Sequence, residues 1–338
     1  MRAVVIEKPR TVQVKEVLKP SPKEGEVIIR VSACGVCGTD VHIYKGEHLG
    51  DYPVVPGHEF AGEVIQVGSA VTEFRIGDRV AVEPNLSCGH CRFCRLNEQN
   101  FCESWKAIGV GLPGGMAEYV AAPASAVFDI GNLSFEMAAF MEPLSCVLHG
   151  MEKVAVRHDE SVLVIGAGPI GLLIAQVARD AGAARIVMVD RVASRLELAQ
   201  QLVADESINT SEGFEAVQQS FPGGADVVID ATGVPAVIEK TVELVRLGGR
   251  ILWFGVAAND AVARIKPFDV FRKGLSIYAS YTSLRNSHEA LQLLGSGTVK
   301  VNRLVSHRLA LEDFERAVKL LEDPEGAMKI LLIPLLCS

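Results

Sequence analysis

The chain has 338 residues, which is long enough for two domains that each bury a core of their own. Hydrophobic residues make up 49% and charged residues 22%, as in an ordinary globular protein. The formal net charge of −8 argues against a nucleic-acid partner, because no basic stripe is available to neutralise phosphates.

The sequence predicts neither a signal peptide nor a membrane span. The apolar run of residues 1–6 is short and is followed at once by Glu7 and Lys8. The uncharged run of residues 161–178 has the length of a short span, but glycine and proline within residues 166–171 divide it into strand, turn and helix. We therefore expect a cytoplasmic protein with no membrane partner.

The amino-terminal part contains cysteine, histidine and glutamate in two short motifs. Residues 1–33 carry short Val- and Ile-rich runs separated by Pro and Gly, which predicts a β-rich lobe. Next come Gly35-Val36-Cys37-Gly38-Thr39-Asp40-Val41-His42 and Gly57-His58-Glu59. A thiolate, an imidazole and a carboxylate are ligands of Zn²⁺, and three protein ligands with an open position are typical of a catalytic site. Taken alone, Cys37 is also compatible with a buried small side chain and His58 with an ordinary loop histidine.

Four cysteines follow at the spacing C-x₂-C-x₂-C-x₇-C, namely Cys88, Cys91, Cys94 and Cys102. Four thiolates complete a tetrahedral coordination sphere and leave no position for a substrate. Without a secretion signal, this spacing indicates metal binding in a reducing compartment rather than disulfides. We expect a structural zinc in this lobe.

A glutamate interrupts the apolar stretch 137–151, in the motif Glu142-Pro143-Leu144-Ser145-Cys146. A buried carboxylate is costly unless it has a partner. From the residues alone, Glu142 is compatible with a cap at the start of the following helix. Cys146 is expected in the core.

From Ser161 the pattern changes to alternating strands and helices. The apolar strand 161–165 leads into Gly166-Ala167-Gly168-Pro169-Ile170-Gly171, which opens a helix reaching about Ala181. These glycines permit a tight turn, close approach of a pyrophosphate and close helix–strand packing. Asp190 ends the next strand 22 residues after Gly168, near the offset of the acid that binds the adenosine ribose.

Further strand–helix units complete the chain. A strand at 226–230 ends at Ala231-Thr232-Gly233, and a helix at 235–247 is expected to stop at Gly248-Gly249. The helix 287–295 and the strand 329–333 follow.

Together, these motifs resemble the zinc-dependent medium-chain dehydrogenases, in the branch that contains sorbitol, xylitol and threonine dehydrogenases. The resemblance covers essentially the whole chain. It implies an α/β fold in which a Rossmann doubly wound parallel sheet is combined with a β-rich GroES-like catalytic domain. Residues 1–150 and 282–338 would form the discontinuous catalytic domain, with the structural zinc lobe at 86–103. Residues 151–281 would form the NAD-binding domain.

The resemblance also implies two Zn²⁺ ions per subunit, NAD and a set of site residues. The candidate ligands of the catalytic zinc are Cys37, His58, Glu59 and Glu142. The proton of the alcohol would pass to Thr39, to the cofactor ribose and then to His42. The candidate cofactor residues are Gly166, Gly168, Pro169, Ile170, Gly171, Asp190, Arg191, Arg195 and Thr232. Family members are dimers or tetramers, and by analogy we expect a tetramer, with a dimer as the alternative.

The activity implied is NAD-linked oxidation of a secondary alcohol in a small polar substrate: a polyol or sugar alcohol, or a related aldonate or sugar-alcohol phosphate. The alternatives are an L-threonine 3-dehydrogenase-like or 2,3-butanediol dehydrogenase-like enzyme and, in another class, a zinc-stabilised dinucleotide sensor without turnover. Sorbitol and threonine dehydrogenases carry an arginine in the loop that enters the helix near residue 287. The aligned residue here is Thr282, and Arg285 either reaches the cleft instead or faces solvent.

Overall fold

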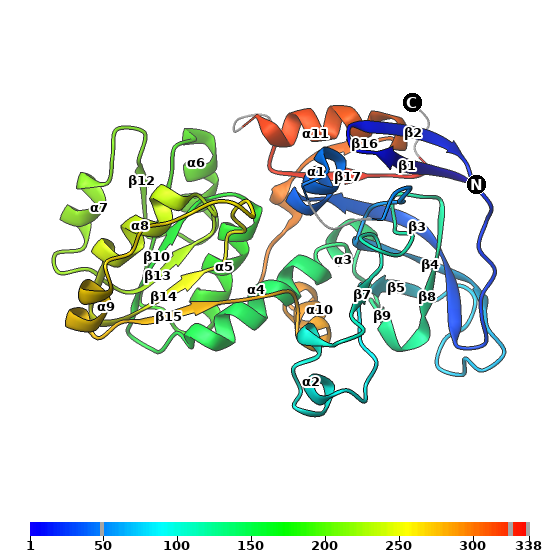
Figure 1. The fold of residues 1–338 in the computed structure, drawn as a ribbon, viewed down its shortest axis with the longest axis horizontal. Helices are drawn as coiled ribbons and strands as arrows, with labels where there is room; N and C mark the ends of the chain where they lie inside the picture. The colour runs from blue at the N-terminus through cyan, green and yellow to red at the C-terminus, as the bar shows by residue number, and fades with distance from the viewer. Residues whose placement is uncertain (48–50, 324–326, 336–338) are drawn as a thin grey trace. The chain divides into compact units, whose positions relative to one another are not determined.

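The structure, a computed structural model, describes residues 1–47, 51–323 and 327–335 and consists of two compact units. One unit comprises Met1–Ser145, Thr282–Gly297 and Val301–Ser338, and the other Cys146–Tyr281 and Thr298–Lys300. The first unit is thus discontinuous in sequence, because the chain returns to it after building the second (Figure 1).

The second unit is built on a six-stranded parallel sheet. In spatial order its strands are β12 (Glu206–Asn209), β11 (Arg185–Asp190), β10 (Ser161–Ile165), β13 (Ala225–Asp230), β14 (Val245–Trp253) and β15 (Ser276–Ala279). Counted along the chain, this order is 3-2-1-4-5-6, that of a doubly wound dinucleotide-binding fold. The order reverses between β10 and β13, so a crevice at the carboxyl ends of these two strands is the expected ligand site. The predicted α/β class is confirmed.

Helices connect the strands of this sheet (Figure 1). They are α5 (Pro169–Asp180), α6 (Ala193–Leu202), α7 (Glu215–Ser220), α8 (Pro235–Leu244) and α9 (Pro267–Lys273), and α4 (Met141–Val154) precedes β10. Because helices cover a parallel sheet, its central strands are apolar on both faces: residues 162–165 of β10 and 186–189 of β11 are all buried.

The end of α8 differs from the prediction. The helix stops at Leu244, and Gly248 and Gly249 lie inside β14 rather than after the helix. Val245 already pairs with Ala225 of β13, and the pairing resumes only at Arg250, so the intervening residues form an irregularity in the strand. Gly248 takes the left-handed φ of 68° that this irregularity requires.

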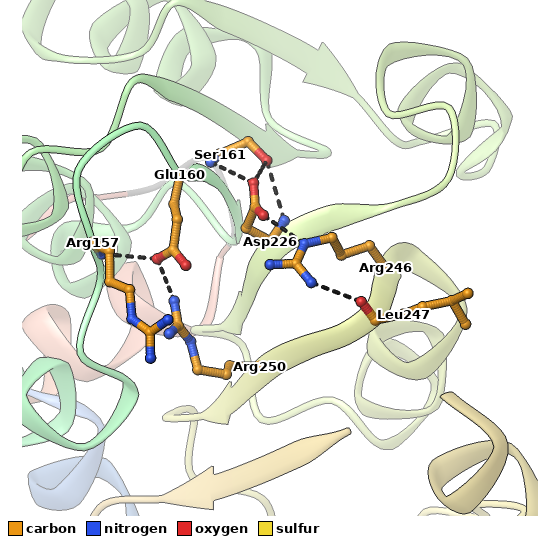
Figure 2. Close-up of polar contacts among 7 residues, drawn as sticks. All are labelled: Arg157, Glu160, Ser161, Asp226, Arg246, Leu247 and Arg250. Atoms are coloured by element: carbon orange, nitrogen blue, oxygen red, sulfur yellow. Dashed lines mark hydrogen bonds and ion pairs between the residues drawn. The ribbon is translucent and has the colours of Figure 1, made fainter. Parts of the chain in front are cut away.

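Two acidic residues tie the amino ends of three strands together (Figure 2). Glu160, just before β10, contacts the Arg250 guanidinium of β14, and both side chains are nearly buried. Asp226 of β13 accepts hydrogen bonds from Ser161 N at 2.9 Å, Ser161 Oγ at 2.6 Å and Arg246 Nε at 2.5 Å. This end of the sheet lies opposite the glycine-rich turn of residues 166–171, which follows the carboxyl end of β10. The two acids therefore stabilise the fold.

The first unit contains a larger, mostly antiparallel sheet. Its strands are β16 (Val305–Leu309), β17 (Lys329–Leu332), β3 (Glu26–Val36), β4 (Glu59–Val67), β5 (Arg79–Val82) and β9 (Val127–Asp129) in spatial order, with β8 (Tyr119–Pro123) pairing to β3. Two two-stranded antiparallel sheets accompany it: β1 (Arg2–Lys8) with β2 (Thr11–Glu16), and β6 (Asn85–Leu86) with β7 (Lys106–Ala107). Phe60, Phe314 and Met116 are fully buried in its core.

Short helices fill the connections of the first unit. They are α1 (Gly38–Lys45), α2 (Arg92–Arg95), α3 (Phe135–Ala138), α10 (Ser287–Gly295) and α11 (Phe314–Glu322), with 3₁₀ turns at Gln99–Phe101, Ala124–Ala126, Asn302–Leu304 and Leu311–Asp313. Within the described residues, every helix is too short or too polar to cross a membrane.

Candidate metal centres and cofactor-binding turn

Cys37 lies at the N-cap of helix α1, where its sulfur accepts a hydrogen bond from Thr39 N at 3.3 Å. Asp40, three residues later, returns the bond by accepting from Cys37 N at 2.9 Å. This reciprocal arrangement is a capping box, with a thiol in place of the usual hydroxyl. The cap fixes the direction of the Cys37 side chain before any metal binds.

The structure brings Cys37 together with His58 and Glu59. Cys37 Sγ lies 3.1 Å from His58 Nε2, and one ligand atom of each of the three residues lies within 4.8 Å of the others. His58 and Glu59 are buried at the start of β4, and Cys37 is half-buried. Cys37 and His58 lie 21 positions apart in sequence. They meet in space because His58 directly precedes β4, whose first residue Glu59 pairs with Gly35 of β3.

Asp40 also faces the far side of the His58 ring. Asp40 Oδ1 lies 3.7 Å from His58 Nδ1, and both atoms are buried without a hydrogen-bond partner among the described residues. A metal-binding histidine usually directs its second nitrogen at such a carboxylate, which fixes the tautomer and the ring orientation. His58 Nε2 is therefore the atom that would bind a metal. The sequence motif predicts no metal-related role for Asp40, although its position three residues after Cys37 is typical of a capping box.

The charges around His58 are mainly negative. Burial lowers the pKa of His58, but Cys37, Asp40 and Glu142 oppose this effect and raise the pKa well above its usual value. Burial also raises the pKa of Asp40. A buried imidazole among anionic groups is an environment that a divalent cation stabilises.

Glu142 is buried in the first turn of α4. It lies outside the set of three ligand atoms within 4.8 Å, but its charge acts on His58. The helix dipole favours a negative charge in a first turn, so the helix-start role and a place near the metal are compatible.

The donor set at this centre fits zinc. Sulfur, imidazole nitrogen and carboxylate oxygen are the donors that zinc takes in catalytic sites, and the orphaned polar atoms of Asp40 and His58 are explained by a metal on the opposite side of the ring. The residues that would hold the ion are Cys37, His58 and a carboxylate from Glu59 or Glu142.

Thr39 and His42 occupy the same helix as Cys37. They lie three positions apart on α1, so their side chains share one face. His42 Nδ1 lies 2.9 Å from Glu47 Oε2, and one third of the His42 side chain is exposed. This places a titratable ring near the surface one turn beyond Thr39.

The four cysteines of the second motif form a closed cluster. Their sulfurs all lie within 4.8 Å of one another, with 4.0 Å between Cys88 and Cys94 and 3.9 Å between Cys91 and Cys102. Zinc with a Zn–S distance of about 2.3 Å separates tetrahedral sulfurs by roughly 3.8 Å, so the spacing fits. Backbone N–H groups of Cys94 and Glu103 hold the pKa of Cys91 well below its ordinary value, which favours the thiolate.

The glycine-rich turn joins β10 to α5 at the switch point of the parallel sheet. Gly166 has a φ of 104°, and Gly168 is the N-cap of α5 with Pro169 in its first turn. A Cβ on Gly171 would lie 1.8 Å from the Gly166 carbonyl oxygen, so only glycine fits there. The free N–H groups and the positive end of α5, whose first turn also contains Ile170, are suited to a pyrophosphate.

Thr232 borders this turn from the end of β13. A Cβ on Gly166 would lie 3.0 Å from Thr232 Cγ2, so the threonine methyl defines one wall. The Thr232 hydroxyl donates to Asp230 Oδ1 at 2.6 Å, which holds the side chain in place.

Asp190 ends β11 beside the same turn. Its carboxylate accepts hydrogen bonds from Ala167 N at 2.7 Å, Arg191 N at 2.7 Å and Val192 N at 3.0 Å. The acid is thereby held against the glycine-rich loop. The Arg195 guanidinium of α6 also approaches the turn, 3.9 Å from where a Cβ on Gly168 would lie.

The loop before α10 places Arg285 against the four-cysteine lobe. Arg285 is exposed, as the solvent-facing alternative predicts, and its Nη1 donates to Asn97 Oδ1 at 3.3 Å. Thr282 and Arg285 have left-handed φ values of 51° and 59°, and Ser283 is anchored by Glu83 at 2.8 Å. The arginine of the related enzymes therefore has no counterpart at Thr282.

Comparison with known proteins agrees with this geometry. A family model described as the alcohol dehydrogenase GroES-like domain matches residues 23–132, and one described as zinc-binding dehydrogenase matches residues 169–296. D-altritol 5-dehydrogenase of Agrobacterium fabrum is 42% identical over 86% of both chains. D-arabinitol dehydrogenase 1 of Uromyces fabae is 36% identical over 94% of this chain and 93% of its own.

Among solved structures, a protein of Sinorhizobium meliloti 1021 described as a zinc-binding dehydrogenase and bound to NADP superposes with a TM-score of 0.94. It is 34% identical, and the match covers 98% of this chain and 99% of that one. The chain thus belongs to the zinc-dependent medium-chain dehydrogenases and is an oxidoreductase of that family.

Proposed function

We propose that this enzyme oxidises a secondary hydroxyl of a polyol, or of a related aldonate or sugar-alcohol phosphate, to the ketone with NAD as the hydride acceptor. The observation that carries the proposal is the set of Cys37, His58 and Glu59, whose ligand atoms lie within 4.8 Å in the part of the chain that the structure describes. A zinc ion bound there would act as a Lewis acid and ease the loss of the alcohol proton.

The residues around the metal centre divide the remaining tasks. Cys37 and His58 would bind the zinc ion, and Asp40 orients the His58 ring through Nδ1. The proton leaves through hydroxyl and imidazole groups in turn: Thr39 Oγ1 both accepts and donates, and His42 passes the proton towards solvent. The partly exposed position of His42 beside Glu47 supports this last role.

The substrate class is supported by the polarity of the site. Asp40, Glu59 and Glu142 are buried carboxyl groups of the same unit. A polar site provides partners for a chain of hydroxyls, whereas an apolar alcohol would leave buried polar groups unpaired. The relatives named for D-altritol and D-arabinitol are polyol enzymes, which favours the same class here.

NAD is the proposed cofactor rather than NADP. The Asp190 carboxylate, held by three backbone N–H groups, would accept hydrogen bonds from the ribose hydroxyls and repel a 2′-phosphate. Arg191 and Arg195 counteract this repulsion, and the similar protein from Sinorhizobium meliloti holds NADP. The preference therefore depends on the balance between one acid and two arginines.

A substrate panel tests the proposed function. We expect kcat/KM for a five- or six-carbon polyol, its aldonate or its phosphate to exceed that for 1-butanol, a 2,3-diol and threonine, with NAD above NADP. A clear preference for 1-butanol or threonine would contradict the substrate class, and binding of dinucleotide without turnover of any member would favour a sensor.

We also propose a homo-oligomer, with a tetramer expected and a dimer as the alternative. Phe268 and Phe271 of α9 expose 68% and 80% of their surface, and β15 is an end strand of the parallel sheet. Exposed aromatic side chains beside a free strand edge are typical of an interface. Light scattering after gel filtration gives the number of subunits, and Phe271→Asp is expected to reduce that number.

A reducing compartment, the cytoplasm, is the proposed location. The seven cysteines among the described residues are free of disulfide bonds, and four of them form the closed metal cluster. Thiolate ligands persist where thiols are kept reduced. Cell fractionation tests this location.

A further inference from the structure

Glu83, an acid outside the ligand and cofactor motifs, directly follows β5 and is half-buried. Its Oε1 accepts hydrogen bonds from Asn85 Nδ2 at 2.7 Å and from Ser283 Oγ at 2.8 Å. Its Oε2 accepts from Ser287 Oγ at 2.7 Å. A buried polar group is costly unless it is hydrogen-bonded, and these neutral donors satisfy both oxygens. Glu83 is thereby held between β6 and the start of α10.

The acid also sets the direction of a longer chain of hydrogen bonds. A carboxylate only accepts, so the Ser287 hydroxyl must give its proton to Glu83. The Ser287 oxygen is then left to accept, and Ser145 Oγ lies 3.3 Å away. Ser145 also donates to Met141 O at 2.8 Å, one turn earlier in α4. Because Ser145 and Ser287 are both buried, a water-excluded path runs from Glu83 through two hydroxyls to the first turn of α4.

The turn of α4 that this path reaches also contains Glu142. Glu142 and Ser145 lie three positions apart on the helix, so their side chains share one face. The first N–H groups of a helix have no partner within it and helix ends fray, so side-chain contacts decide how firmly a first turn is held. Ser287 provides such a contact on the face that carries Glu142. Because the charge of Glu142 acts on His58, a displaced first turn would weaken the negative charge at the candidate metal position.

We propose that Glu83 is a positioning residue that fixes the first turn of α4 and thereby holds Glu142 beside the candidate catalytic zinc. The hydroxyls of Ser287 and Ser145 carry the link between the two acids. Glu83 acts through Glu142 and needs no contact of its own with metal or substrate. The inference rests on the zinc of the proposed function and names a residue that keeps its surroundings in place.

Competition for zinc with a chelator of known affinity tests the proposal without relying on activity. Glu83→Ala removes the acceptor from which the path begins. We expect the catalytic centre to lose roughly tenfold in zinc affinity, the lower end of the range over which outer partners change metal binding. Ser287→Ala interrupts the path at its middle and should act in the same direction, which keeps the test available if Glu83→Ala folds poorly. Cys37→Ser, in which only the four-cysteine zinc is expected, identifies the signal of the other ion.

Two further variants serve as matched controls. Ser283→Ala removes a donor to the same carboxylate but lies off the path to α4, so its zinc affinity should stay at the wild-type value. Glu83→Gln can place its amide oxygen towards Asn85 and its NH₂ group towards Ser287, whose hydroxyl can turn to accept. It therefore keeps the path connected and should restore most of the affinity lost in Glu83→Ala.

The same measurement in a Glu142→Gln background separates positioning from a loss of packing. Glu142→Gln removes the charge that Glu83 is proposed to hold in place. Adding Glu83→Ala or Ser287→Ala to it should therefore cause no further loss of zinc affinity. A packing defect would lower the melting temperature and zinc affinity equally in both backgrounds.

The contrary outcomes are distinct. An equal loss of zinc affinity with and without Glu142→Gln would overturn the proposal, because Glu83 would then act by another route. Unchanged zinc affinity in Glu83→Ala and Ser287→Ala would overturn it as well, and a lower melting temperature would then show a purely structural role. Either result with two zinc ions in the wild-type chain refutes this inference alone. A wild-type chain that holds only the four-cysteine zinc refutes the proposed function and this inference together.

Discussion

At the scale of single residues, Asp40 has two tasks within one helical turn. One oxygen caps α1 through Cys37 N, and the other faces His58 Nδ1 at 3.7 Å. The residue therefore links the direction of the thiol ligand to the orientation of the imidazole ligand. Neither task requires contact with substrate.

Asp40→Asn should weaken zinc binding at the catalytic centre while leaving α1 intact. The amide oxygen still caps the helix, but the negative charge facing His58 is lost, and outer partners of this kind are worth roughly ten- to hundredfold in metal affinity. Competition with a chelator of known affinity measures the loss, and Asp40→Ala, which removes the cap as well, is the control for α1. Unchanged zinc affinity in Asp40→Asn would show that the carboxylate only caps the helix.

Asp190 is the residue on which cofactor choice depends. Asp190→Asn keeps the size of the side chain but removes the charge that would face a 2′-phosphate. We expect the ratio of kcat/KM for NADP to that for NAD to rise by about tenfold or more, because like charges placed together cost several kcal/mol. Steady-state kinetics with both cofactors provide the ratio. A wild-type enzyme that already prefers NADP would show that Arg191 and Arg195 outweigh the acid.

At the scale of elements, the four-cysteine lobe is a candidate metal site that contacts the loop before α10. Arg285 of that loop donates to Asn97 of the lobe. Loss of the metal would therefore loosen the lobe and also weaken the hydrogen bond by which Asn97 holds the loop before α10.

Cys91→Ser should remove the structural zinc and lower the melting temperature by about 5 °C or more, the shift that a loss of about 2 kcal/mol gives in a unit of this size. The ranking of substrates should change less than stability does. Differential scanning fluorimetry and zinc content are the measurements. A Cys91→Ser variant with the zinc content and melting temperature of the wild type would contradict the assignment.

The amino end of the parallel sheet carries a pH-dependent contribution to stability. Burial alone raises the pKa of Asp226, but the hydrogen bonds from Ser161 and the Arg246 guanidinium outweigh it and lower the pKa from its usual value. A depressed folded-state pKa means that the stabilisation is present above the unfolded value of about 3.9 and is lost as the pH falls below it.

The free energy of unfolding should therefore fall less with decreasing pH in Asp226→Asn than in the wild type. Trp253 of β14 reports on the second unit, and Trp105→Phe provides a background in which it is the sole tryptophan. Thermal unfolding followed by Trp253 fluorescence between pH 6 and pH 2 compares Asp226→Asn with the wild type. Equal pH dependence would mean that Asp226 has the same pKa in the folded and unfolded chain.

Sequence patterns predicted the bounds of an element correctly where a strong local signal, such as a flanking breaker residue, lay at each of its ends. The strand Ser161–Ile165 and the helix Ser287–Gly295 have the bounds expected from apolar runs and flanking breakers. The end of α8 did not follow its breaker, because pairing of Val245 with Ala225 starts β14 before Gly248 is reached. Strand pairing is a non-local interaction, so a local breaker signal does not locate it.

At the scale of the whole molecule, the candidate residues for chemistry and those for cofactor recognition lie in different compact units. Cys37, His58 and Glu59 lie in the first unit, and the glycine-rich turn with Asp190 lies in the second. Motifs with fixed spacing identified both sets from sequence. The ion pair of Lys329 with Glu59 is not predictable from a local pattern, because the two residues lie 270 positions apart and meet only through the β17–β3–β4 arrangement.

Transfer of deuterium tests the central claim most directly. A polyol labelled at its secondary carbinol carbons is incubated with NAD and either wild-type enzyme or Cys37→Ser, and the reduced cofactor is analysed by mass spectrometry. The account predicts one deuterium per reduced cofactor with the wild type, none with Cys37→Ser, and retained dinucleotide binding in that variant. Deuterium transfer by Cys37→Ser at the wild-type rate would contradict a catalytic zinc held by Cys37 and His58.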